Sequence, residues 1–287
     1  MEALSHTDAA VFAERVRPVI DASPGFTSVL ATNLDHALHG SGFPGHWFLI
    51  QDGEQPVGAA MYTPPYDLFL TPVPDAEAAT TALAETVARA GLAPSGVYGP
   101  VAVVKAFLAA WRRRTGQDGR IIGTDRLYEI DSPPAGPDVT GAARPVTEAD
   151  LELAAAWLHE FEVEVEHGPV TDDPQRIVRR RLARGHLLLW VSDDEPVSMA
   201  AISRPIAGAA RIGAVFTPKE HRGKGFGSAV TAAATRQGFA DGAERCLLYA
   251  DLANPTSNHI YQAIGFRPVG DSARLTFAPR HIVTATL

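Results

Sequence analysis

Two patterns of apolar and polar positions recur along the chain at the same spacing. Residues 45–65 (GHWFLIQDGEQPVGAAMYTPP) and 185–205 (GHLLLWVSDDEPVSMAAISRP) each contain an apolar run, an acidic turn and a second apolar run. Both begin with Gly-His, carry Pro-Val in the middle and end with Pro, at a constant offset of 140 residues (185 minus 45). Short apolar runs around a turn predict a β-hairpin in each segment. Chance similarity between two mixed α/β segments is the alternative, but the fixed spacing favours an internal duplication.

The pattern continues in the same order beyond each hairpin. The strand-like LFLTP at 68–72 corresponds to AVFTP at 214–218, and an Ala-rich stretch of helical character follows each. In the second half the pattern predicts a strand at 143–146, helices over 147–161 and 173–185, the hairpin, a strand at 211–217 and a helix over 228–240. A strand at 245–251, a helix over 255–264 and a final strand pair follow. This alternation predicts an α/β fold with a mixed, mostly antiparallel sheet flanked by helices.

A Pro-rich segment separates the two halves. Residues 131–145 (DSPPAGPDVTGAARP) contain four prolines and two glycines, a composition typical of linkers. We therefore predict a first domain over 1–132, a linker over 133–141 and a second domain over 142–287.

Composition and charge exclude several classes of protein. The 287 residues are 46% hydrophobic and 20% charged, as in soluble globular proteins, and the net charge is -8. An acidic chain does not suit nucleic acid or an anionic membrane, because both require a basic face. Cys246 is the only cysteine, so neither an intramolecular disulfide nor a multi-cysteine metal site can form. The N-terminus carries no signal-peptide pattern. We expect a cytoplasmic protein with no metal site, no nucleic-acid partner and no membrane association.

The stretch VFTPKEHRGKGFGSAV at 215–230 has the features of an anion site. Gly223, Gly225 and Gly227 lie between a predicted strand and a predicted helix, and Arg222 and Lys224 add positive charge. Backbone N–H groups at a helix N-terminus bind phosphate, and glycines let the ligand approach closely. A Gly-rich surface loop with two solvated cations is the alternative. Neither a Walker A loop nor a dinucleotide fingerprint fits, because Pro218, Gly225 and Ser228 occupy positions where those motifs require other residues.

The motif that does fit is Arg-x-x-Gly-x-Gly, formed by Arg222, Gly225 and Gly227 directly after the strand. It resembles the pyrophosphate-binding signature of the GNAT superfamily of acyl-CoA-dependent N-acyltransferases. A second segment, DLANPTSNHIYQAIGFRPVGD at 251–271, is similar to the GNAT pattern Asn-x-x-Ser-x-x-x-Tyr-x-x-x-Gly-Phe. Asn254 can cap this helix and Gly265 can end it, and the two motifs follow each other in the GNAT order.

The resemblance implies two tandem GNAT-like domains, of which the second binds acetyl-CoA and transfers its acetyl group to a primary amine. Tyr261 would protonate the departing thiolate, although an aromatic packed beneath the Gly-Phe turn is the alternative. A backbone N–H near the end of the strand can stabilise the oxyanion. The expected acyl-CoA contacts are Val215, Phe216, Thr217, Arg222, Gly223, Lys224, Gly225, Phe226, Gly227, Ser228, Asn254, Ser257, Asn258 and Tyr261.

The general base is sought in the acidic stretch HEFEVEVEHG at 159–168. Glu160, Glu162, Glu164 and Glu166 alternate with apolar residues, which predicts an extended segment with one charged face. In GNAT folds this region borders the acceptor cleft, so one carboxylate can act as base, with Glu164 and Glu162 the first candidates. A solvated edge of an acidic protein is the alternative.

The first half lacks the anion site. Its LFLTP strand is followed by VPDAEAATTALAETV, with Asp75 and Glu77 where cations would be needed. We therefore predict a degenerate GNAT-like first domain that shapes the acceptor cleft but has no CoA site. An acyl-CoA-binding regulatory protein without turnover, another acyl donor, or a thiol or peptide acceptor stay open as alternatives. We expect a small-molecule amine acceptor and a monomer or homodimer; the sequence does not identify the acceptor.

Overall fold

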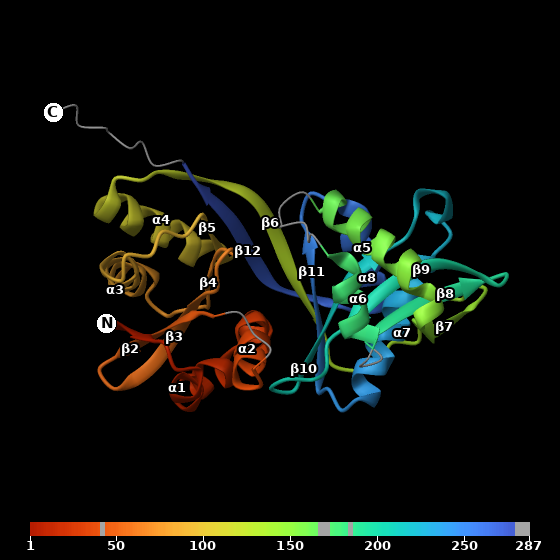
Figure 1. Ribbon diagram of the computed structural model, residues 1–287, viewed down its shortest axis with the longest axis horizontal. Coiled ribbons are helices and arrows are strands. Elements are labelled where there is room, and N and C mark those ends of the chain that lie inside the picture. The colour runs from red at the N-terminus through yellow and green to blue at the C-terminus, as the bar shows by residue number, and fades with distance from the viewer. Residues whose placement is uncertain (41–43, 166–172, 183–185, 279–287) are drawn as a thin grey trace. The chain divides into compact units, whose positions relative to one another are not determined.

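The computed structural model describes residues 1–40, 44–165, 173–182 and 186–278, and Figure 1 shows their helices and strands. The chain divides into two units by its internal contacts. Unit 1 consists of Met1–Thr124 together with Asp271–Leu287, and unit 2 consists of Asp125–Gly270. Among the described residues, none of the helices has the length and apolar character that crossing a membrane would require.

Unit 1 has a mixed sheet in the order β1-β2-β3-β4-β5-β12 with helices on both faces. Among the described strands of this unit, only β4 and β5 pair in parallel. A core of buried side chains from α3, α4 and these strands fills one face, and α1 packs on the other, where Phe12 contacts Trp47. The elements are β1 (Glu2–His6), α1 (Ala9–Ala22), α2 (Pro24–Leu38), β2 (His46–Asp52), β3 (Gln55–Tyr62), β4 (Leu68–Leu70), α3 (Ala76–Arg89), β5 (Gly96–Pro100) and α4 (Val101–Thr115).

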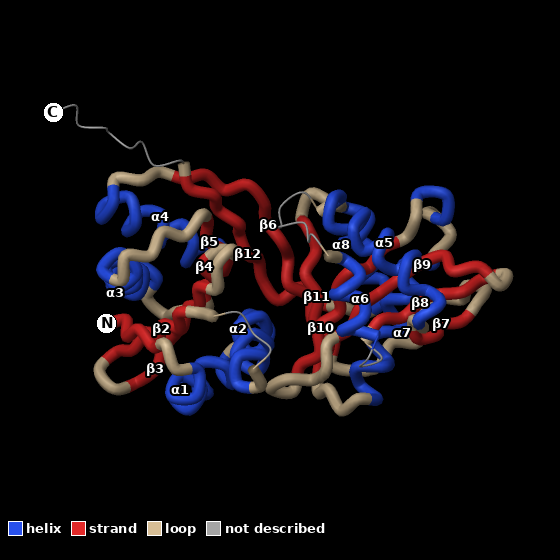
Figure 2. Tube along the Cα trace, in the orientation of Figure 1, coloured by secondary structure: helices blue, strands red, loops and turns tan. Residues whose placement is uncertain are grey.

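Unit 2 has a sheet of the same kind in the order β7-β8-β9-β10-β11-β6, with β10 and β11 as its parallel pair. Helices α5 and α6 pack on one face of this sheet and α7 and α8 on the other, and each face has its own apolar core. Figure 2 shows these helices in blue and the strands in red. The elements are β7 (Ala142–Pro145), α5 (Leu151–Glu164), α6 (Pro174–Leu182), β8 (Leu187–Ser192), β9 (Glu195–Ile202), β10 (Ala209–Phe216), α7 (Phe226–Ala240), β11 (Arg245–Asp251) and α8 (Pro255–Ile264).

The two units repeat one succession of elements, as the duplicated pattern predicts. The hairpin strands β3 and β9 keep the offset of 140 residues at both ends (195 minus 55, and 202 minus 62). Both hairpins also have a register shift at the equivalent place, between Ile50 and Gln51 in one and between Trp190 and Val191 in the other. The tandem arrangement predicted from the sequence is therefore confirmed.

The last strand of each repeat belongs to the other unit. Residues 125–130 of β6 (Gly119–Ile130) pair with β11 in unit 2, whereas residues 272–276 of β12 (Arg267–Phe277) pair with β5 in unit 1. The unit boundaries therefore differ from the predicted division at 132 and 142. The predicted final strand pair is also wrong, because β12 is a single strand.

The segment predicted as a linker, 133–141, lies inside unit 2. Arg236 on α7 donates hydrogen bonds from Nη1 to the carbonyl oxygens of Pro134 and Ala135, at 3.2 and 3.1 Å. Val139 packs against the core beneath α7 and α8, and the indole nitrogen of Trp190 donates to the carbonyl of Thr140. Proline removes backbone donors but leaves carbonyl acceptors, so a Pro-rich segment can still be fixed by donating side chains.

Candidate functional site

The parallel strands β10 and β11 pair only near their N-terminal ends. Ala209–Arg211 pair with Arg245–Leu247, after which β10 follows β9 to Phe216 and β11 follows β6 to Asp251. The register of β10 against β9 shifts between Gly213 and Phe216, and Ala214 has a φ of 48° within that stretch. A bulge of this kind bends a strand and ends its pairing on one side. The backbone of β10 beyond Arg211 therefore has no ladder with β11 among the described strand pairings.

The equivalent strands of unit 1 stay together. Leu68 and Phe69 of β4 pair with Val97 and Tyr98 of β5. At Gly99, the next residue of β5, a Cβ atom would lie only 2.6 Å from the carbonyl oxygen of Leu70. The separation of the central parallel pair is thus a feature of unit 2.

The glycine loop ends in an uncapped helix N-terminus. Helix α7 begins at Phe226, two residues earlier than predicted, and its N-cap is Gly225 with a φ of 83°. Among the described residues, no side chain caps this terminus, so the first N–H groups of the helix are available to a ligand. Gly223 also has a positive φ, 76°, and a Cβ added there would meet no atom within 4 Å. Oriented N–H groups, open space and the positive end of the helix dipole suit a phosphate.

Arg222 is held beside this loop by two acceptors. Its Nε donates to the carbonyl of Thr217 at 2.8 Å, and its Nη2 donates to Oε1 and Oε2 of Glu164 at 2.7 and 2.9 Å. Buried Ser198 on β9 holds the end of β10, because its Oγ lies 2.9 Å from the carbonyl oxygen of Phe216 and 2.8 Å from Oγ1 of Thr217. The loop, the end of β10 and the C-terminus of α5 therefore form one hydrogen-bonded group.

The acidic stretch is helical, which corrects the predicted extended segment. Helix α5 continues to Glu164, because Trp157 and Leu158 are buried and Phe161 packs with them at helical spacing. Glu160 is exposed and Glu162 is half-buried, whereas Glu166 lies outside the described residues. Glu164, the first candidate for the base, directs both carboxylate oxygens at Arg222.

Helix α8 has the caps predicted for it. Oδ1 of Asn254 accepts from the N–H of Ser257 at 3.0 Å, and Gly265 ends the helix with a φ of 111°. Asn258 has an internal role, because its Nδ2 donates to the carbonyls of Asp251 and Asn254, both at 2.7 Å. The side-chain amide group of Asn258 therefore donates to two backbone carbonyls. The ligand contact predicted for Asn258 is left to its side-chain oxygen, Oδ1.

Tyr261 lies at the inner side of α8. Its ring centroid is 6.2 Å from that of Tyr128 and 6.4 Å from that of Phe266, and its side chain is buried. Burial raises the pKa of Tyr261 to about 12, and a hydrogen bond with Ser257 opposes part of that rise. The phenol therefore stays protonated across physiological pH, as a proton donor must.

Tyr128 is the residue at this site that sequence reasoning missed. It lies on β6, in a strand pattern that reads as ordinary core, and its O–H donates to Oδ1 of Asn258 at 2.8 Å. The hydroxyl in turn accepts a bond from Nε2 of Gln262 at 3.2 Å. A tyrosine next to Leu127 in this strand was the only signal, and nothing local indicated its partners on α8.

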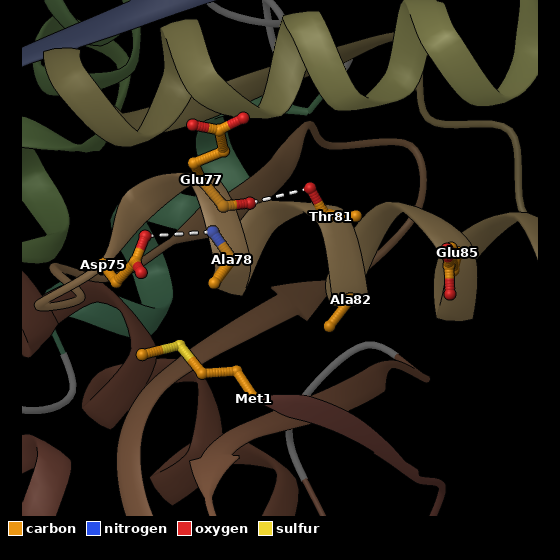
Figure 3. A pocket seen from close by; sticks show the side chains of 7 residues that line it. All are labelled: Met1, Asp75, Glu77, Ala78, Thr81, Ala82 and Glu85. Carbon is orange, nitrogen blue, oxygen red and sulfur yellow. Dashed lines mark hydrogen bonds between the residues drawn. The ribbon is translucent and has the colours of Figure 1, made fainter.

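A hollow in unit 1 contrasts with the loop of unit 2. It lies at the start of α3 and is lined by Met1, Asp75, Glu77, Ala78, Thr81, Ala82 and Glu85 (Figure 3). Oδ1 of Asp75 accepts from the N–H of Ala78 at 3.0 Å, so the chain's own carboxylate occupies the helix N-terminus. Three carboxylates in this hollow would repel a phosphate. Within the described residues, no group of His, Cys, Asp and Glu side chains could hold a metal ion.

Comparisons with known proteins agree with this geometry. Residues 151–266 match the model of the acetyltransferase (GNAT) family. No curated protein matches the sequence. A solved Drosophila protein is 13% identical with a TM-score of 0.68, covering 96% of this chain and 98% of its own.

Two further structures carry GNAT names. A GNAT-family acetyltransferase from Colwellia psychrerythraea is 11% identical with a TM-score of 0.59, covering 96% of this chain and 99% of its own. A tandem GNAT protein from the clavulanic acid biosynthesis pathway is 16% identical with a TM-score of 0.54, covering 96% and 98%. At these identities the structures show the shared fold. Residues 151–266 are thus similar to the GNAT acetyltransferase family, and the chain shares its two-unit fold with these structures.

Proposed function

We propose that unit 2 transfers the acetyl group of acetyl-CoA to a primary amine by direct attack of the amine on the thioester. The observation that carries the proposal is the parting of β10 from β11 beside the uncapped N-terminus of α7. GNAT acetyltransferases use an acyl-CoA donor, and this arrangement offers an extended backbone edge and an anion site next to each other.

The residues present fit acetyl-CoA, which supplies the activated acetyl group. The N–H groups of Gly223 to Ser228, with Lys224, would hold the diphosphate, since positive φ angles at Gly223 and Gly225 shape an open, positively polarised turn. The backbone of Val215 to Thr217 would pair with the pantetheine amides as an added strand, with Phe216 buried beneath.

Helix α8 would complete the donor site. Asn254 and Ser257 lie on its first turn, and Tyr261 follows one turn later. We assign Tyr261 the role of proton donor to the departing thiolate. Its raised pKa makes it a weak acid in the free protein, so the transfer needs a short hydrogen bond to the sulfur as negative charge develops there.

The amine must lose its proton before attack, and the acidic end of α5 is where we place that step. Glu162 is half-buried on this helix and remains the candidate base, acting directly or through water. Glu164 is engaged with Arg222, so we assign it to the donor side of the site instead.

The test is acceptor-dependent release of CoA. The full chain is incubated with acetyl-CoA and a panel of small primary amines, with thiols and peptides as further arms, while free thiol is measured. Release that depends on a primary amine supports the proposal. Tight binding of acetyl-CoA without release from any acceptor would instead indicate a protein that senses acyl-CoA.

A further inference from the structure

A group of hydrogen-bonded polar side chains joins the strand β6 to the helix α8. The hydroxyl of Tyr128 is bonded both to the side-chain oxygen of Asn258 and to the amide of Gln262, at 2.8 and 3.2 Å. Nδ2 of Asn258 in turn donates hydrogen bonds to the carbonyl oxygens of Asp251 at the end of β11 and of Asn254 at the start of α8. The hydroxyl and Asn258 thus connect β6 and β11 to α8, the helix that carries Tyr261.

Tyr128 also touches Tyr261 by packing. Its side chain is completely buried, and the two rings lie 6.2 Å apart at an angle of 58°. Rings at this separation and tilt restrict each other's orientation. The position of the Tyr261 phenol therefore depends on Tyr128 through the ring contact and through the bonds that hold α8.

Unit 1 shows that the fold itself does not need this polar group. Helix α4 follows the N-cap Pro100 as α8 follows the N-cap Asn254, so residues can be compared by counting from each cap. The places of Asn258, Tyr261 and Gln262 are taken in unit 1 by Val104, Phe107 and Leu108.

The strand beneath α4 is apolar as well. β12 contributes Ala273, Leu275 and Phe277 to the core of unit 1, whereas β6 contributes Tyr128 and Ile130 to the core of unit 2. The same helix therefore packs on the same kind of strand with apolar side chains alone. Tyr128 is completely buried, so its hydroxyl has a desolvation cost that the apolar side chains of unit 1 avoid.

We propose that Tyr128 is a positioning residue for acetyl transfer, which holds α8 so that the hydroxyl of Tyr261 faces the reacting sulfur. This inference rests on the proposed function. It also means that a strand from the first half of the sequence contributes to the site in the second half. Misplacement of a reacting group by about 1 Å can lower a rate by about a hundredfold, so loss of one such bond has a measurable effect on turnover.

The experiment is a double-mutant cycle in the full chain, with kcat and the KM for acetyl-CoA measured by thiol release. Tyr128→Phe keeps the ring and removes the hydroxyl. We expect kcat to fall about tenfold, which is part of the hundredfold or more that a positioned proton donor contributes, while the KM for acetyl-CoA changes less than about twofold. In a Tyr261→Phe background the same substitution should change kcat less than about twofold, because the group that Tyr128 positions is gone.

The matched control is Thr235→Val, which removes a buried hydroxyl bonded only within α7, to the carbonyl of Thr231 at 2.8 Å. It should lower the melting temperature and leave kcat unchanged. An unchanged kcat in Tyr128→Phe, or an equal fall in both backgrounds, would overturn the inference while leaving the proposed function intact. A wild-type chain that releases no thiol with any acceptor would contradict the proposed function, and the inference would fall with it.

Discussion

Arg222 and Glu164 form a bifurcated contact in which one guanidinium nitrogen lies 2.7 and 2.9 Å from the two carboxylate oxygens. The pair links the glycine loop to the C-terminus of α5, which are separated by 58 positions in the sequence. Both side chains are a little over 40% exposed, at 44% and 43%, so the pair is worth at most about 1 kcal/mol. The pair places the negative charge of Glu164 next to a loop that is suited to bind an anion.

Removing that charge should strengthen CoA binding. Glu164→Gln abolishes the carboxylate beside the loop and releases Arg222 toward the diphosphate, so we expect the dissociation constant for CoA to fall by up to about fivefold. Calorimetric titration at low salt measures the change, which should shrink as salt screens the charges.

Glu160→Gln is the matched control for this substitution. It removes a carboxylate from an exposed position one helical turn earlier in α5, and CoA affinity should not change. Weaker CoA binding by Glu164→Gln would show that Glu164 supports binding. A loss of turnover, together with loss of the fall in rate at acidic pH that the wild type shows, would identify Glu164 as the base.

Substitution of Gly225 should weaken CoA binding before it affects chemistry. Its φ of 83° is unfavourable for other residues, and a Cβ would lie 2.9 Å from Cγ2 of Val139. For Gly225→Val we expect the KM for acetyl-CoA to rise by about tenfold or more, with a smaller change in kcat. Gly242→Val imposes comparable backbone strain at a φ of 92° beyond the other end of α7, and it should leave the KM unchanged. Equal effects of the two variants would contradict a local role for the loop.

Tyr261→Phe should lower kcat by about a hundredfold with little change in CoA affinity, as expected for loss of a proton donor. Because burial raises its pKa to about 12, the wild-type rate should show no alkaline loss from this group below about pH 10. Steady-state kinetics from pH 6 to about 10, together with CoA titration, test both statements. A parallel loss of affinity and turnover would identify Tyr261 as a packing residue.

Cys246 should make the protein less stable in alkali. The thiol is completely buried, and burial raises its pKa from 9.0 to about 12. The unfolded chain releases this proton near pH 9 and the folded chain does not. The contribution of the thiol to the free energy of unfolding is therefore fully present below pH 9. It is lost as the pH rises toward 12, by up to about 1.4 kcal/mol per pH unit.

Urea unfolding of the wild type and Cys246→Ala at pH 8, 9 and 10 measures this effect. The variant should lose less unfolding free energy over that range, whatever its starting stability. Identical slopes for the two proteins would show that the thiol ionises normally in the folded state.

Local patterns predicted the parts of the structure that are decided locally. The bounds of β11 and α8 agree with the prediction because the cap at Asn254, the proline after it and Gly265 mark the helix by their own chemistry. The duplicated hairpins were likewise evident, since an acidic turn between two apolar runs is a short-range signal.

The features that the sequence did not reveal depend on distant partners. Whether β6 or β12 completes a sheet is decided by pairing across more than a hundred residues, and both strands have suitable patterns. The glutamates of α5 alternate with valines as in a strand, yet the burial of Trp157 and Leu158 keeps the chain helical. Tyr128 is found only when the strand that carries it is placed beside α8.

Acetyl transfer by unit 2 is tested by measuring both products of the reaction in the same samples. Free thiol and acetylated amine are quantified together for the wild type, for Gly225→Val, and for Glu77→Gln in the hollow of unit 1. We expect one acetylated amine per thiol released, a strong loss of both at subsaturating acetyl-CoA in Gly225→Val, and wild-type rates in Glu77→Gln. Thiol release without an acetylated amine, or a rate that depends on Glu77 and not on Gly225, would contradict acetyl transfer at the parted strands of unit 2.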